Sequence, residues 1–194
     1  NHDELRMSSL LDTKRSLLGH TLMFTLNGVP LIYSGGEVGE LTRREMIDWT
    51  DPDDMRPYFK KLIELHKKYV HNPVITRINN SESSDVYSYS SVSGSNTIIT
   101  AANFKDQEKN ITVDLSNLAY DGSSTYFLTD LISGQVYSVS PSSRANYALT
   151  LENYQARVFY YGLDSVSVVS VDDNQTSMLP SEYKLYQNYP NPFN

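Results

Sequence analysis

The spacing of apolar residues changes near residue 73, and this change constrains the possible folds more than any other feature of the chain. Before it, Leu11, Leu18, Leu22 and Leu26 follow one another at intervals of seven, four and four, which places them on one face of a helix. After it, apolar and polar residues alternate over short segments, the pattern of half-buried strands. The sequence therefore predicts a helix-containing part followed by an all-β part.

The first part reads as helix, strand, helix. Asn27 and Gly28 end the first predicted helix, as a C-terminal cap does. The apolar run at residues 29–33 has the length and flanks of a buried strand with a proline near its start. Asp51 before Pro52 is a helix-start signal, and Asn72-Pro73 ends the helix that follows. This order predicts an α/β unit.

The second part contains seven short segments with strand character, separated by turns rich in glycine, serine and asparagine. These segments are residues 86–90, 97–102, 111–115, 125–128, 136–139, 148–151 and 157–161. Strands of this length and regular spacing predict an antiparallel β-sandwich. The stretch at 163–178 is rich in serine, valine and aspartate and is interpreted as a linker.

Composition excludes several classes of protein. The chain has 194 residues with a formal net charge of −7, which argues against nucleic acid as a partner because phosphate binding needs basic clusters. It has no cysteine, so disulfides and thiolate metal sites are excluded. No apolar run reaches the roughly 18 residues of a transmembrane segment. The N-terminus has no signal-peptide pattern, and a fragment of a longer protein is expected.

Three motifs occur in order along the first part of the chain. The chain begins with Asn1-His2-Asp3, which is similar to the fourth signature segment of the α-amylase family of glycoside hydrolases, family 13. Residues 28–39 read GVPLIYSGGEVG, which resembles the eighth barrel strand, and 46–49 read MIDW, similar to the region after it. The resemblance covers about residues 1–162. It implies an α/β plus all-β fold: the last βα units of a (β/α)₈ TIM barrel, followed by an antiparallel β-sandwich like the amylase C-terminal domain.

The resemblance also implies roles for individual residues. Such enzymes are retaining glycosidases, and Asp3 would be the acid that stabilises the transition state at the end of barrel strand seven. His2 would donate a hydrogen bond to the same sugar, and Asn1 would support the loop. Glu37 would be either a hydrogen-bonding residue at the strand end, which is the favoured interpretation, or a substrate ligand.

The expected activity is hydrolysis of α-1,4-glucans such as starch and maltodextrins by the full-length protein. The nucleophile and the general acid belong to barrel strands that this chain does not contain, so the chain alone is expected to be inactive. We expect no cofactor and no metal ligand in these residues. Calcium is common in the family, but its usual ligands lie upstream.

The last residues, 179–194, end in YPNPFN and resemble the start of the C-terminal sorting domain of type IX secretion. This resemblance implies a protein that is secreted or held at the cell surface, with the secretion machinery as a partner. The expected organisation is therefore the end of a catalytic barrel at 1–71, a β-sandwich at 72–162, a linker at 163–178 and a truncated sorting domain at 179–194.

Two alternatives remain open on the sequence. One is a transglycosylase or a cyclodextrin or oligosaccharide hydrolase of the same family, which only upstream loops would distinguish. The other is a non-catalytic β-sandwich that acts as a spacer or binding module on a secretion tail. The spacing between Asn-His-Asp and the motif at 28–39 argues against this second alternative.

Overall fold

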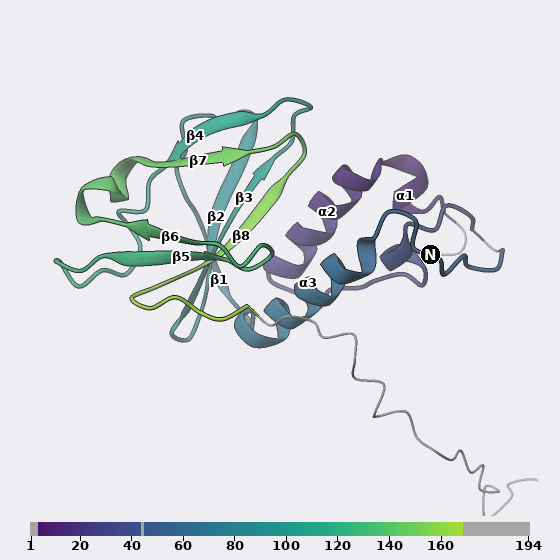
Figure 1. Ribbon diagram of the computed structural model, residues 1–194, viewed down its shortest axis with the longest axis horizontal. Helices are drawn as coiled ribbons and strands as arrows, with labels where there is room; N and C mark the ends of the chain where they lie inside the picture. The colour runs from purple at the N-terminus through teal and green to yellow at the C-terminus, as the bar shows by residue number, and fades with distance from the viewer. Residues whose placement is uncertain (1–3, 44, 169–194) are drawn as a thin grey trace, which may run out of the picture.

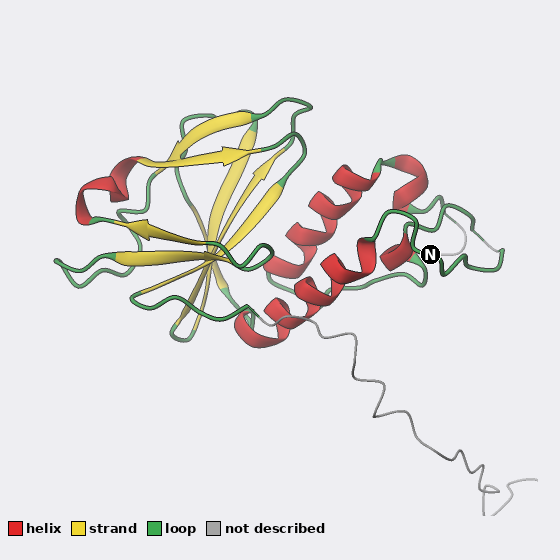
Figure 2. Cartoon of the chain, in the orientation of Figure 1, coloured by secondary structure: helices red, strands yellow, loops and turns green. Residues whose placement is uncertain are grey.

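The structure is a computed structural model that describes residues 4–43 and 45–168 (Figure 1). Two helices, α2 and α3, form one layer, and an all-β body lies beside them (Figure 2). The helical elements are α1 (Met7–Leu10), α2 (Thr13–Thr25), α3 (Met55–Tyr69) and the short 3₁₀ helices η1 (Gly36–Val38) and η2 (Pro141–Asn146). The strands are β1 (Val74–Arg77), β2 (Val86–Ser93), β3 (Asn96–Asn103), β4 (Lys109–Val113), β5 (Tyr126–Asp130), β6 (Val136–Val139), β7 (Tyr147–Leu151) and β8 (Ala156–Gly162).

The strands form two antiparallel sheets. Six of them make one sheet in the order β1-β2-β3-β8-β5-β6, and β4 pairs with β7 in a second. Among the described residues the strand pairings are antiparallel. The predicted antiparallel β body is therefore confirmed, and each of the seven predicted strands corresponds to one of β2–β8. The sequence prediction did not include β1.

The large sheet is buried on both faces, because the small sheet covers one and the helices cover the other. On the first side, Ile99 and Ala101 of β3 belong to a core that includes residues of β4 and β7. On the second side, Ile98 of β3 packs in a core with Phe24 of α2 and Leu62 of α3. This explains why the middle of β3 reads as a nearly continuous apolar run rather than an alternation.

Local signals determine where the helices begin. The Asp12 side chain accepts a hydrogen bond from the Arg15 amide at 2.8 Å and caps α2. The Asp51 carboxylate accepts from the amides of Met55 at 2.8 Å and Arg56 at 3.0 Å, the first two residues of α3. Asp51, predicted as a helix-start signal, therefore does bind the first amides of α3, although the helix begins only at Met55.

The predicted strand at residues 29–33 is wrong. This segment forms no strand and pairs with none in the described part of the chain, and Val29 and Leu31 are 95% and 77% exposed. A buried parallel strand needs hydrogen-bonded neighbours on its flanks, and the described strands are all committed to the two antiparallel sheets. The expected βα barrel units are accordingly not shown, and no barrel closes.

The predicted linker begins with residues that pack against the body. Val166 and Val168 contact the core between the helices and the sheet, and the Val166 amide donates to the Thr129 hydroxyl at 3.2 Å. The remainder of that segment and the predicted sorting domain lie outside the described residues. Among the helices that are described, none is long and apolar enough to cross a membrane.

Candidate functional site

Of the predicted site residues, Asn1, His2 and Asp3 lie outside the described part of the chain. Glu37 is described and stands in the centre of η1, between α2 and α3 in sequence. The roles predicted for the first three residues are therefore untested, and the surroundings of the site are defined by the residues that follow them and by the loop that carries Glu37.

Glycines shape the loop around Glu37. Gly35 and Gly39 flank η1 with φ values of 84° and 72°, a left-handed backbone that side chains with a Cβ disfavour. A Cβ at Gly35 would lie 2.9 Å from the Cβ of Glu40, closer than real side chains approach. The glycines of the GVPLIYSGGEVG motif thus allow a tight reversal that brings Glu40 close to Gly35.

Arg6 anchors this loop to the start of the chain. Its side chain is buried, and its guanidinium donates hydrogen bonds to the carbonyls of Ser34 and Thr42. The same group lies over the Tyr33 ring at 4.7 Å from the centroid, within cation–π range. Arg6 therefore holds the start of the described chain against the loop that carries Glu37.

Glu40 organises the far end of the same loop. Its carboxylate accepts hydrogen bonds from the Thr42 amide and hydroxyl, both at 2.7 Å, and from the Asp48 amide at 2.9 Å. These bonds, led by that from the Thr42 amide, lower the pKa of the Glu40 carboxyl to about 2. Glu40 is buried and ionised, and the sequence analysis missed it because an acid after a glycine-rich turn looks like ordinary surface.

Glu37 differs from Glu40 in its bonding. One carboxylate oxygen of Glu37 is buried and has no hydrogen-bond partner among the described residues. A buried carboxylate oxygen without a partner is uncommon and costs free energy. The role favoured for Glu37, a hydrogen-bonding residue at a strand end, stays a prediction.

An apolar hollow of about 480 Å³ lies beside the Arg6 anchor. Leu5, Leu10, Leu31 and Tyr33 line it, and each of these side chains is more than a third exposed. His20 also lines it; burial lowers the pKa of its imidazole, although a hydrogen bond between Nδ1 and the Ser16 carbonyl at 2.8 Å opposes this. An apolar surface of this kind marks a place where another part of a protein or a ligand packs.

The described residues contain no group of three or more histidine and acidic side chains that could hold a metal ion. Around Arg6 the structure places the carboxylates of Glu37 and Glu40 together with backbone dipoles. Such a set can orient hydroxyl groups and stabilise positive charge, but a nucleophile with a partner acid is not among these side chains.

Solved structures resemble this chain over most of its length. A noncanonical maltogenic α-amylase from Thermotoga neapolitana matches 84% of the chain with a TM-score of 0.65 and 19% identity, over 40% of its own length. An α-amylase from Anoxybacillus matches 84% of the chain with a TM-score of 0.70 and 19% identity, over 36% of its length. The fold is similar to the C-terminal β domain of α-amylases. This chain spans about two-fifths of the length of these structures.

A third structure, an α-amylase from Geobacillus thermoleovorans in complex with acarbose, matches 83% of the chain with a TM-score of 0.69 and 18% identity, over 37% of its length. At identities this low, the likeness shows similarity of fold alone. No protein-family model matches the chain, and no curated protein matches its sequence.

Proposed function

We propose that this chain is the C-terminal part of a secreted, retaining α-glycosidase that acts on α-1,4-glucans. The single observation that carries the proposal is the extent of the likeness to α-amylases. The likeness covers 84% of the chain. The β body at residues 72–162 makes up less than half of the chain. The likeness therefore includes the helical part as well as the β body. A generic β-sandwich module would not share the preceding helices.

The Arg6 anchor supports a shared site for Asp3 and Glu37. Asp3 precedes Arg6 by three residues, and a three-residue stretch of chain spans at most about 11 Å. Because Arg6 bonds the carbonyls of Ser34 and Thr42, the loop that carries Glu37 lies within reach of the Asn-His-Asp segment. In the proposed enzyme Asp3 and Glu37 therefore lie on the same side of one substrate-binding site.

In the proposed reaction Asp3 is neither nucleophile nor proton donor. Its carboxylate binds hydroxyls of the sugar at the cleavage site and stabilises the oxocarbenium-like charge that develops there. His2 donates a hydrogen bond to the same sugar, and Asn1 supports the loop. The nucleophile and the general acid are supplied by residues outside this chain, and calcium stays a prediction for the longer protein.

The test is Asp3→Asn in the longer enzyme, assayed on soluble starch. Loss of charge stabilisation should lower kcat by about 10² to 10⁴ with little change in the thermal midpoint. Asp106→Asn, at an exposed position of the β body, is the matched control and should retain normal turnover. Near-normal kcat in Asp3→Asn would refute the assignment. The isolated chain should hydrolyse no starch.

Residues 179–194 carry a second proposal, that they begin a type IX sorting domain. The proline pair in YPNPFN supports a turn, because proline fixes φ and removes a hydrogen-bond donor at alternate positions. This segment would address the protein to the outside of the cell and contribute nothing to catalysis.

A further inference from the structure

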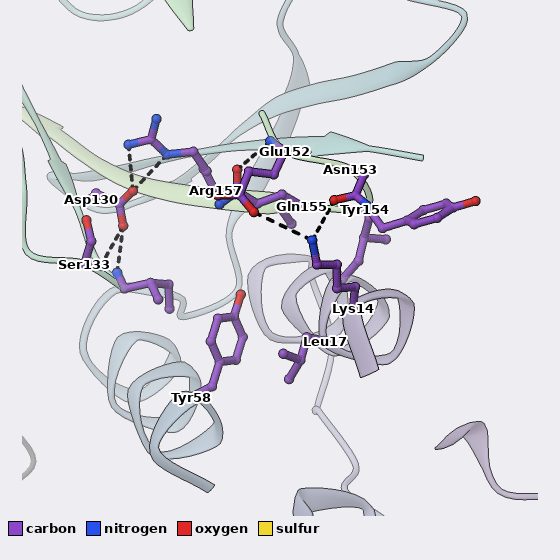
Figure 3. Close-up of a pocket in the computed structure, with 13 residues that line it drawn as sticks. Lys14, Leu17, Tyr58, Asp130, Ser133, Glu152, Asn153, Tyr154, Gln155 and Arg157 are labelled. Carbon is purple, nitrogen blue, oxygen red and sulfur yellow. Dashed lines mark hydrogen bonds and ion pairs between the residues drawn. The ribbon is translucent and has the colours of Figure 1, made fainter. Parts of the chain in front are cut away.

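A hollow of about 220 Å³ lies where the helical layer meets the β body (Figure 3). Leu17 from α2 and Tyr58 from α3 form its helical wall, and the turns around Ser133 and Asn153 form the other. It shares no lining residue with the apolar hollow beside Arg6. It is therefore separate from the site proposed above.

The charged groups around this hollow occur in pairs of opposite sign. Lys14 Nζ lies 3.7 Å from a Glu152 carboxylate oxygen and donates to the Asn153 side-chain oxygen at 2.6 Å. Arg157 Nε donates to the buried Asp130 carboxylate at 3.0 Å, and Arg157 Nη2 forms an ion pair with the same carboxylate oxygen at 2.9 Å. The two cations and the two anions cancel, so the lining favours a neutral ligand over a phosphate or a carboxylate.

The hydroxyl of Tyr58 faces the hollow as a hydrogen-bond acceptor. Thr21 donates its own hydroxyl proton to the Leu17 carbonyl at 2.8 Å. In the 2.8 Å bond between Thr21 and Tyr58, the Tyr58 hydroxyl must therefore be the donor. Its lone pairs remain, and Figure 3 shows this oxygen directed between the two walls of the hollow.

Two amides supply complementary donors. The Gln155 side-chain oxygen accepts from the Glu152 amide at 2.9 Å, and the Asn153 side-chain oxygen accepts from Lys14. Their NH₂ groups have no partner within the described residues, and both residues line the hollow. A ligand that offers acceptors to these amides and a donor to Tyr58 would match all three groups.

The remaining lining is apolar. Leu17, Leu18, Ile132 and Ala156 present aliphatic carbon to the hollow. A molecule with hydroxyls on its rim and C–H groups on its face fits such a surface. The volume lies below the roughly 300–1,000 Å³ of pockets for drug-sized ligands, which limits the occupant to about one ring.

We propose that this hollow binds a single neutral sugar unit, either a free monosaccharide or the end of a glucan. The ligand would contact α2, α3 and both β turns at once. Binding would therefore stabilise the packing of the helical layer on the β body, since a ligand that binds only the folded state raises its stability. The proposal needs no hydrolysis and is independent of Asp3.

The experiment is an NMR titration of the 194-residue chain, labelled with ¹⁵N, with glucose, maltotriose and glucose 6-phosphate. Because one ring offers few contacts, we expect saturable shifts with a Kd on the order of 1–10 mM. These shifts should centre on Leu17, Ser133 and the amides of 152–156. Glucose 6-phosphate should bind at least several-fold more weakly.

Two variants and a matched control test the site itself. Leu17→Trp fills the hollow and should abolish the shifts, and Tyr58→Phe removes the acceptor and should weaken binding by about 3- to 10-fold. Tyr87→Phe, on an exposed part of β2, should bind as the unchanged chain does. Tyr58→Phe keeps the test valid if the tryptophan variant does not fold.

Each outcome decides the matter. Tighter binding of maltotriose than of glucose identifies a glucan end, and equal binding identifies a free monosaccharide; both sustain the proposal. The absence of saturable shifts up to about 100 mM glucose overturns it, as does an equal loss of binding in Tyr87→Phe. An inactive Asp3→Asn enzyme whose chain still binds sugar here would separate the two proposals.

Discussion

Replacement of Glu40 by glutamine should loosen the loop at residues 40–48 without unfolding the protein. The glutamine oxygen can still accept from the Thr42 amide and hydroxyl. Its NH₂ group, however, would face the Asp48 amide, so that two donors oppose each other where the carboxylate now accepts at 2.9 Å. The substitution therefore removes one charge-assisted hydrogen bond and weakens two others.

The size of the effect follows from the pKa of Glu40. This pKa falls from 4.5 to about 2 in the folded protein. At about 1.4 kcal/mol for each pKa unit, the hydrogen bonds to the ionised carboxylate are worth at most about 3.4 kcal/mol. Because the loop lies next to solvent, screening reduces this to about 1–2 kcal/mol of local stability.

Amide hydrogen exchange measures this quantity directly. In Glu40→Gln the Thr42 and Asp48 amides should exchange about 5- to 30-fold faster, while amides in β3 keep their protection. Glu45→Gln, an exposed acid in the same loop, is the matched control and should change neither amide. Unchanged exchange at Thr42 and Asp48 in the Glu40 variant would refute the reasoning.

Acid should reproduce the effect in the unchanged protein. A carboxyl whose pKa is lowered by folding stabilises the folded state fully above its unfolded pKa of 4.5 and loses that contribution as pH falls toward 2. The protection of the two amides, corrected for intrinsic exchange, should therefore decline below about pH 4.5.

Two further predictions concern His20 and the tail. Burial lowers the pKa of His20, so the unfolded chain binds more protons than the folded one as pH falls through the ordinary value of 6.5. The thermal midpoint should therefore fall as pH drops from about 7 to 5. His20→Gln should reduce this pH dependence, whereas His71→Gln, at an exposed position, should not. Removal of residues 169–194, which leaves Val166 and Val168 in place against the core, should abolish activity of the longer protein in the medium but leave it in a cell extract. Activity that persists in the medium would contradict the sorting proposal.

Local patterns in the sequence were sufficient to predict much of the fold. The seven strands follow from alternation and turns, and the start of α3 follows from Asp51, whose carboxylate caps the helix four residues later. These features depend on residues close together in the chain, so their physics is contained in a short window. The strand β1 was missed because four residues give too little alternation to recognise.

The candidate site was predictable only in part. The motif at residues 28–39 pointed to Glu37 and contains the glycines that shape its loop. It gave no indication of Arg6 or Glu40, because their importance lies in bonds to backbone atoms: Arg6 reaches carbonyls 28 and 36 residues away, and Glu40 accepts from an amide eight residues on. Every residue has a backbone carbonyl, and every residue except proline has an amide N–H, so the residue types of such partners do not reveal these bonds.

The sequence by itself determined α2, α3 and the strands β2–β8, since hydrophobic period and capping are local properties. Only the tertiary structure decided what covers them. It placed Phe24 of α2 against the sheet, left Val29 and Leu31 exposed where a buried strand was expected, and created the sugar-sized hollow between Tyr58 and the turn at Asn153. The physical reason is that burial depends on which surfaces meet in space, and an apolar run can lie exposed to solvent when no neighbouring strand is present to pair with it.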